Sequence, residues 1–188
     1  MPTPHRVRII GGRDRGRQIR VPDAAGVRPT PDRVRETLFN WLGQDLAGAT
    51  TLDLYAGTGV LTLEARSRGA ALCVAVDRDA ALIRALRDTG RAIGGADIET
   101  HVADALRYLS TETRTFDIAF LDPPFAADAW NALFPMLGKR LSRGGRVYAE
   151  APRSLDAPPG FQLLRHGRAG NVHYHLLARL TAPDAPSR

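Results

Sequence analysis

The fold of this chain is decided where a buried strand passes into a glycine turn, at Leu52-Asp53-Leu54-Tyr55-Ala56-Gly57-Thr58-Gly59. A helical pattern begins directly after the turn, at Val60. Glycines in such a turn let the backbone approach a ligand closely at the start of the helix. A dinucleotide-binding turn would carry the pattern G-x-G-x-x-G, and Thr62 stands at its third glycine position, which weighs against a pyrophosphate-binding dehydrogenase.

Strands and helices alternate from this turn onward. Apolar runs predict strands at residues 50–55, 71–77, 98–103, 116–122 and 145–151, with helices at 60–67, 78–93 and 127–141. Two further runs, 161–166 and 172–180, predict an antiparallel hairpin. This alternation predicts an α/β fold in which helices cover both faces of a mostly parallel sheet.

Three features lie at the ends of predicted strands, where such sheets bind ligands: the glycine turn, Asp77 and Asp104. Asp77 lies twenty positions past Gly57, which suits hydrogen bonds from ribose hydroxyls, and Asp104 is placed to accept from the amino group of an adenine. Each acid alone is equally consistent with a cap on the next helix. Together they predict a pocket for a nucleoside with a small charged tail. The predicted lining is Asp53, Ala56, Gly57, Gly59, Asp77, Arg78, Asp104 and Ala105.

The fourth predicted strand ends in Asp122-Pro123-Pro124-Phe125. Both prolines fix φ and lack an N–H, so the chain leaves the sheet as a stiff elbow that can aim acceptors outward. A planar amine there can donate to the Asp122 carboxylate and a backbone carbonyl while its ring stacks on Phe125, as in enzymes that act on an everted base. The alternative is an ordinary turn, since Asp and Pro are common turn residues.

Positive charge is concentrated in the first 40 residues. These carry nine arginines against four acids, a balance of +5, whereas the other 148 residues hold 17 basic and 16 acidic groups. Alternation of arginines with apolar residues around Gly11-Gly12 and Gly16 predicts a twisted hairpin with arginines along one side. Such a ribbon suits a phosphate backbone, and a merely solvated basic face is the alternative. The predicted RNA contacts are Arg6, Arg8, Arg13, Arg15, Arg17 and Arg33.

A Pro-rich joint follows the hairpin and leads into a further helix. Thr30 is predicted to cap this helix and Pro31 to take its first position, with Val34, Leu38 and Leu42 at helical spacing. We therefore predict a basic β-hairpin extension over residues 1–27, a main domain over 28–181 and a frayed tail over 182–188.

Other features narrow the class of protein. No apolar stretch approaches the roughly 20 residues that span a bilayer, and the N-terminus lacks the apolar core of a signal peptide, so we expect a cytoplasmic protein with no membrane partner. The single Cys73 lies in a predicted buried strand and is expected to be an inert core thiol. The five histidines show no H-x-x-x-H spacing, so no metal site is expected.

Several segments together resemble a known family along nearly the whole chain. They are Arg8-Ile9-Ile10-Gly11-Gly12 with Arg15-Gly16-Arg17, then Arg28-Pro29-Thr30, Asp32–Leu42, the turn at 53–59 and the elbow at 122–125. This combination is similar to the RsmD family of small-subunit ribosomal RNA guanine-N2 methyltransferases. Residues 33–42 are the specific part, since glycine turns and D-P-P-F occur in many S-adenosylmethionine enzymes that act on exocyclic amines.

The resemblance implies a Rossmann-like methyltransferase fold with seven strands, and S-adenosylmethionine as the donor, leaving S-adenosylhomocysteine. It implies a guanine of 16S rRNA as the target, within a small ribosomal subunit or an assembly intermediate, and we expect a monomer. Asp122, Pro123, Pro124 and Phe125 would be the catalytic residues. Family members typically have Ser and Gly where this chain has Thr58 and Thr62, which leaves the details of the cofactor turn open.

Two other classes of function remain open from the sequence. A DNA adenine or cytosine amino-methyltransferase would use the same elbow. A non-catalytic RNA-binding module would keep the basic hairpin and would have no affinity for S-adenosylmethionine. A small-molecule methyltransferase is less attractive, because the first 40 residues would then have no role.

Overall fold

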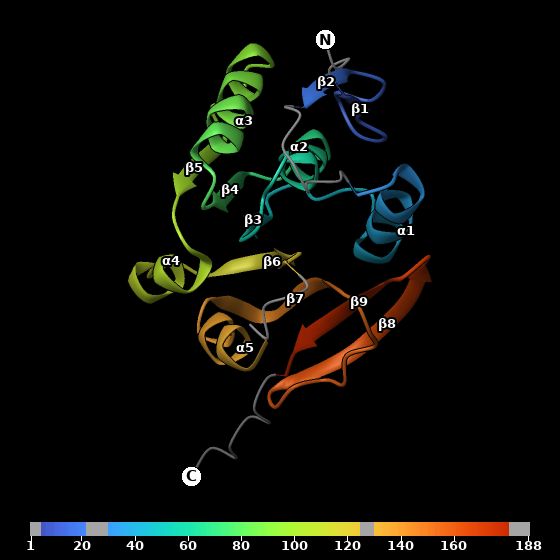
Figure 1. Cartoon of the computed structure of the whole chain (residues 1–188), viewed down its shortest axis with the longest axis vertical. Coiled ribbons are helices and arrows are strands. Elements are labelled where there is room, and N and C mark those ends of the chain that lie inside the picture. Colours follow the sequence, from blue (N-terminus) through green and yellow to red (C-terminus); the bar gives the residue numbers. More distant parts are fainter. Residues whose placement is uncertain (1–4, 22–29, 125–129, 181–188) are drawn as a thin grey trace.

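A seven-stranded sheet runs through the centre of the computed structural model, which describes residues 5–21, 30–124 and 130–180 (Figure 1). The strand order is β5-β4-β3-β6-β7-β9-β8. The strands are β3 Thr50–Asp53, β4 Leu72–Asp77, β5 Ile98–Val102, β6 Phe116–Leu121, β7 Leu141–Ala151, β8 Phe161–Ala169 and β9 Val172–Arg179. Strands β3 to β7 pair in parallel, and β9 pairs antiparallel with both β7 and β8. The predicted parallel sheet with a C-terminal antiparallel hairpin is confirmed.

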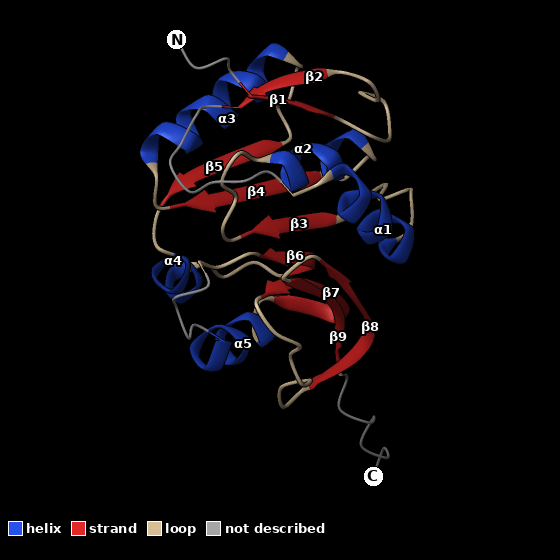
Figure 2. Cartoon of the chain, turned by 45° about the vertical axis from the view of Figure 1, so that its right-hand side comes forward, coloured by secondary structure: helices blue, strands red, loops and turns tan. Residues whose placement is uncertain are grey.

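Helices cover both faces of this sheet (Figure 2). They are α1 Asp32–Leu42, α2 Val60–Ser67, α3 Ala80–Ala92, α4 Ala105–Thr111 and α5 Trp130–Gly138. Helices α4 and α5 pack against one face through residues such as Leu109 and Leu137. Helices α1, α2 and α3 pack on the other face, through residues such as Leu38 and Leu86. Within the described ranges, no helix has the length and apolarity that a membrane crossing requires.

Several element boundaries differ from the sequence prediction, and one helix was not predicted. The helix predicted over 127–141 corresponds to α5, which ends at Gly138. Helix α3 begins at Ala80 rather than at residue 78, because Asp79 caps it by accepting hydrogen bonds from two backbone N–H groups of its first turn. The sequence assigned no element to 104–115, where the structure has the seven-residue helix α4. Strand β7 begins at Leu141 instead of residue 145, since Leu141 pairs with Phe116 across a register shift.

The basic N-terminal segment forms its own two-stranded antiparallel sheet, as predicted. Strands β1 His5–Arg8 and β2 Gln18–Val21 pair so that Arg6 faces Arg20 and Val7 faces Ile19. Val7 and Ile19 are buried against the helices, and the arginines point to solvent. The boundary predicted at residue 27 and the tail predicted over 182–188 both lie outside the described residues, so the division into parts stays a prediction.

Thr30 does not cap helix α1, which corrects the sequence prediction. The helix begins at Asp32, Pro31 takes the cap position, and no side chain caps the helix. Backbone N–H groups of the first turn donate to the Pro31 carbonyl instead. The Thr30 hydroxyl donates to Glu150 at 3.3 Å, across 120 residues of sequence. A long-range partner has therefore replaced the local cap.

A buried ion cluster fastens the N-terminal segment to helices α1 and α2. Glu64 is fully buried and accepts hydrogen bonds from the guanidinium groups of Arg35 and Arg68. The same carboxylate accepts the backbone N–H of Ile10 at 2.8 Å, and Arg35 also donates to the Arg8 carbonyl at 3.0 Å. Each charge in this cluster has an opposite partner, which is the condition under which buried charges are tolerated.

Candidate active site

The strand order reverses between β3 and β6, and ligands of open α/β sheets bind in the crevice that forms there. From β3 the chain moves outward to β4 and β5, then returns to β6 on the other side of β3. Asp53 is the last residue of β3, and Asp122 directly follows β6. The Leu54 N–H donates to the Phe120 carbonyl at 3.2 Å, so the ends of the two strands are held together. Both acids therefore border the reversal point.

The glycine turn lies at the same edge and has the backbone shape that glycine permits. Gly57 and Gly59 have φ of 51° and 75°, in the left-handed region. A Cβ on Gly59 would lie 2.3 Å from a methyl carbon of Leu86, so this position excludes any side chain. Asp77 braces the turn, because its carboxylate accepts the Gly57 N–H at 2.8 Å. The structure thus brings together four predicted cofactor residues: Ala56, Gly57, Gly59 and Asp77.

Asp53 lies beneath this turn and is almost completely buried. Its side chain accepts a hydrogen bond from the Thr62 hydroxyl at 2.9 Å, and burial raises the pKa of Asp53 to about 7 despite that bond. Thr62 is the residue that departs from the glycine expected in the family, and its hydroxyl fixes the carboxylate. A buried acid of this kind is well suited to a ligand that brings positive charge.

The remaining predicted cofactor residues are Asp104, Ala105 and Arg78, and within the described residues no hydrogen bond links them to the glycine turn. Asp104 caps helix α4, since its carboxylate accepts from the N–H groups of Leu106 and Arg107 at 3.0 and 3.1 Å. Asp104 is therefore a helix cap, which is the alternative that the sequence left open. It nevertheless lies at the carboxyl edge of the sheet, where the Ala103 N–H donates to the Asp77 carbonyl. Ala105 is buried in the core, so only its backbone is left to meet a ligand, and Arg78 is exposed.

The Asp122 elbow lies at the same end of the sheet, directly after β6. Pro123 is buried and Pro124 is exposed, while Phe125 lies outside the described residues. Burial, together with the nearby charges of Glu150 and Asp53, raises the pKa of Asp122 above its ordinary range. Within the described ranges, the Asp122 carboxylate has no hydrogen-bond partner. This half-buried acid lies near two other acids, and its oxygens are available to accept hydrogen bonds.

Known proteins similar to this chain identify its family. The profile of a family described as Conserved hypothetical protein 95 matches residues 7–178. The chain is 36% identical over 178 residues to the ribosomal RNA small subunit methyltransferase D of Escherichia coli, covering 92% of this chain and 90% of that protein. The chain belongs to this methyltransferase family. The resemblance drawn from the sequence is confirmed.

Solved structures agree with membership of this family. A putative methyltransferase of Escherichia coli superposes with a TM-score of 0.85 at 36% identity, covering 93% of this chain and 98% of that one. A Thermus thermophilus 16S rRNA N2 methyltransferase, solved with AdoMet and guanosine, has a TM-score of 0.71 at 26% identity. That alignment covers 94% of this chain and 50% of the other. The predicted Rossmann-like methyltransferase fold is confirmed.

Glu150 is the site residue that the sequence analysis missed in this family member. It lies near the end of β7, is only 6% exposed, and accepts hydrogen bonds from the hydroxyls of Tyr148 at 2.8 Å and Thr30 at 3.3 Å. Burial raises its pKa. The sequence signal was available, because Glu150 interrupts the otherwise apolar end of a predicted strand just as Asp53 does.

The predicted RNA-binding arginines divide into two groups. The Arg13 N–H donates to the Ser67 carbonyl at 2.7 Å, and its guanidinium pairs with Asp97 at 2.8 Å. Ser67 ends α2 and Asp97 precedes β5, so the hairpin loop lies at the amino edge, opposite the crevice (Figure 2). Arg15 and Arg17 belong to the same loop.

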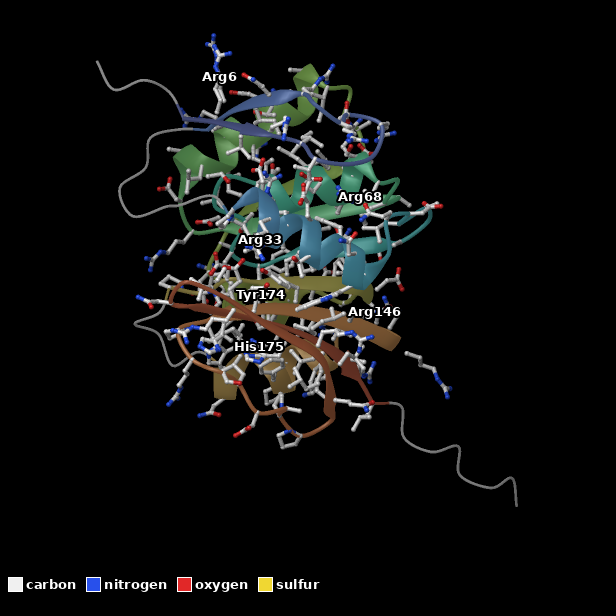
Figure 3. All side chains as sticks on the ribbon, turned by 90° about the vertical axis from the view of Figure 1, so that its right-hand side faces the viewer. Arg6, Arg33, Arg68, Arg146, Tyr174 and His175 are labelled. Carbon is white, nitrogen blue, oxygen red and sulfur yellow. The ribbon has the colours of Figure 1, made fainter. Side chains whose placement is uncertain are left out.

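Arg6, Arg8 and Arg33 lie outside this loop. The Arg8 carbonyl accepts from Arg35, whose guanidinium also donates to the Thr30 carbonyl, and Thr30 reaches Glu150 at the crevice. Arg33 is exposed in the first turn of α1, and the Arg6 guanidinium donates to the side chain of Gln18 at 3.2 Å (both arginines are labelled in Figure 3). These contacts link the Arg8 backbone and the start of α1 to Glu150, and they leave the side chains of Arg6 and Arg33 exposed.

Proposed function

We propose that this protein transfers a methyl group from S-adenosylmethionine to the N2 amine of a guanine in 16S rRNA. The observation that carries the proposal is the position of Asp122 directly after β6, beside the end of β3 where Asp53 and the glycine turn lie. The likeness to a guanosine-bound 16S rRNA N2 methyltransferase supports the choice of the N2 atom.

The chemistry of the crevice fits this cofactor. S-adenosylmethionine carries a sulfonium and an ammonium group, both cationic, together with hydroxyl and amine donors. The acids Asp53, Asp77 and Asp104 supply acceptors and negative charge for those groups, whereas they would repel a pyrophosphate. Asp77 would hold the ribose, Asp104 the adenine and Asp53 the methionine end. When bound, the cofactor supplies an electrophilic methyl group.

The residues of the elbow would activate the target amine. The N2 lone pair of guanine is delocalised into the ring, which makes the amine a poor nucleophile. Hydrogen bonds from the amine to the Asp122 carboxylate and the Pro123 carbonyl favour a pyramidal nitrogen whose lone pair can attack. No strong base is needed, because the nitrogen becomes far more acidic once it carries the methyl group. Much of the acceleration then comes from holding nitrogen and methyl about 3–3.5 Å apart.

The setting of the reaction follows from its substrate. The exposed arginines Arg6, Arg8 and Arg33 would bind the phosphate backbone, which positions RNA without reading its sequence. Phe125 would stack on the everted base. Selection of one guanine then depends on RNA shape, in a small ribosomal subunit or an assembly intermediate. The protein would act as a monomer in the bacterial cytoplasm.

The proposal is tested by methyl transfer from labelled S-adenosylmethionine to small ribosomal subunits, free 16S rRNA and duplex DNA, followed by nucleoside mass spectrometry. We expect N2-methylguanosine from RNA and no transfer to DNA. Asp122→Ala should lower kcat by roughly 10²–10³ while cofactor affinity measured by calorimetry stays unchanged. Asp88→Ala, at an exposed position of α3, is the matched control. Near-normal transfer by Asp122→Ala would refute the mechanism.

A further inference from the structure

Glu150 and Asp122 are neighbours on adjacent strands of the sheet. The register pairs Leu121 with Ala149, so Asp122 and Glu150 are the next residues along β6 and β7. Side chains alternate between the faces of a sheet, and residues side by side in register point to the same face. Neighbouring strands lie about 4.8 Å apart, which sets the two carboxyl groups next to each other at the crevice.

The Glu150 carboxylate is held in one orientation. The hydroxyls of Tyr148 and Thr30 both donate to the same oxygen, Oε1. Within the described part of the chain, the second oxygen, Oε2, has no hydrogen-bond partner. The contacts with Tyr148 and Thr30 therefore use one oxygen and leave Oε2 available to accept a hydrogen bond from a ligand.

From this pair we propose that Glu150 is the residue that selects guanine, accepting a hydrogen bond from its N1–H while Asp122 accepts from its N2 amine. This inference rests on the proposed function and adds the residue that recognises the base. Guanine presents N1–H and the N2 amine as adjacent donors on its Watson–Crick edge. Adenine presents an acceptor at N1, which would face the Glu150 carboxylate with two lone pairs opposed.

The electrostatics of the pair agree with such a ligand. Burial raises the pKa of both acids, and the Glu150 charge raises that of Asp122 further. Hydrogen bonds donated by N1–H and N2–H stabilise two adjacent carboxylates that nothing else in the described crevice neutralises. A base without the N1 donor leaves that repulsion in place, and rejection of such a base is the usual result when buried polar groups are left unpaired.

The first test uses the wild-type enzyme and two RNAs. After the methylated position has been mapped, 16S rRNA is assembled from synthetic and transcribed pieces with guanine or 2,6-diaminopurine at that position. Diaminopurine keeps the N2 amine and has an acceptor at N1. We expect kcat/KM to favour guanine by roughly 10- to 100-fold. Equal values would overturn the role of Glu150. No transfer to either RNA would overturn the proposed function, and this inference with it.

The second test is the Glu150→Gln variant on the same RNAs. Because Tyr148 and Thr30 donate toward Oε1, the amide oxygen takes that place and the amide NH₂ faces the base. That donor opposes guanine N1–H and suits the acceptor of diaminopurine. We expect the preference for guanine to fall by roughly 10- to 100-fold, with cofactor affinity unchanged.

A structural role for Glu150 would give a different result. If Glu150→Gln lowers kcat/KM for both bases equally, so that the preference is unchanged, Glu150 only supports the fold and the inference is wrong. Glu36→Gln, on the exposed side of α1, is the control and should leave both rates unchanged. Should Glu150→Gln fail to fold by circular dichroism, the wild-type comparison of the two RNAs decides alone.

Discussion

Two groups of acids in this molecule are withdrawn from water, and they differ in what faces them. The crevice acids, Asp53, Asp122 and Glu150, face hydroxyls and one another. The paired acids, Glu64 and Asp97, each face two arginines. The pKa shifts separate the groups. Burial raises the pKa of Asp53 to about 7, whereas burial of Asp97 is outweighed by hydrogen bonds from Arg66 and Arg13, which hold its pKa below the ordinary value.

The contrast assigns a role to each group. An acid that forms ion pairs with arginines inside the protein is not available to bind a ligand. Its ion pairs instead hold segments of the chain together. An acid left unmatched in a crevice costs stability and persists because a ligand completes it, which is the usual origin of strongly shifted pKa values at active sites.

Removal of a paired acid should be the most damaging change. Glu64→Ala leaves the buried guanidinium groups of Arg35 and Arg68 without their shared partner. We expect the free energy of unfolding to fall by about 3–5 kcal/mol, measured by urea denaturation. Asp88→Ala, exposed on α3, should change it by less than about 0.5 kcal/mol. A loss below about 1 kcal/mol for Glu64→Ala would mean that the pairing is not structural.

Removal of a crevice acid should have the opposite effect on stability. The pKa of Asp122 is raised in the folded state, so its contribution to stability is present below its ordinary pKa and is lost as pH rises through the raised value. Asp122→Ala eliminates that loss. At pH 8 we expect an unfolding free energy equal to or higher than that of the wild type, even though methyl transfer is largely lost. Destabilisation as severe as that of Glu64→Ala would remove the distinction between the groups.

The pH dependence of cofactor binding tests the crevice charge. Burial raises the pKa of Asp53 to about 7, so the cofactor end of the crevice gains negative charge as pH rises past neutrality. A cationic ligand favours the ionised acids. Its affinity should therefore fall by up to about tenfold per pH unit below 7, with protons released on binding. Calorimetry between pH 6 and 8 measures both effects, and Asp53→Asn should flatten the dependence. A flat wild-type profile would contradict the prediction.

The elements were predictable because each depends on a local pattern. Apolar runs broken by the glycine turn gave β3, β4 and β6 in the right order, and the alternation gave the parallel sheet. The sequence predictions were wrong where the structure of a residue depends on a partner that is distant in the sequence. Thr30 has the sequence of a helix cap, but its hydroxyl is used by Glu150, 120 residues later. Helix α4 was missed because seven residues are too few to show a helical period.

The candidate site was predictable only where residues follow strand ends. Asp53, Asp77 and Asp122 were found on that rule. Glu150 was missed although it lies at the end of a predicted strand, directly before Ala151 and Pro152. The arginines were grouped by charge, and charge does not reveal that Arg13 pairs with Asp97 at the amino edge. Partners so distant in sequence become visible only when the fold brings them together.

The arginines test the same contrast, between side chains that are ion-paired within the protein and side chains that are not. The expected effect is the smallest of the four. Arg13 and Arg17 pair with Asp97 and Asp14, at 2.8 and 3.5 Å, whereas Arg6 and Arg33 are exposed and pair with no acid within the described residues. Replacing Arg6 and Arg33 with Ala should reduce the slope of log affinity for rRNA against log salt by about 0.7–0.9 for each phosphate that the variant no longer neutralises. Replacing Arg13 and Arg17 should lower the unfolding free energy and leave that slope nearly unchanged. The opposite result would place the RNA at the hairpin loop, so that a matched arginine can serve a ligand as well as the fold.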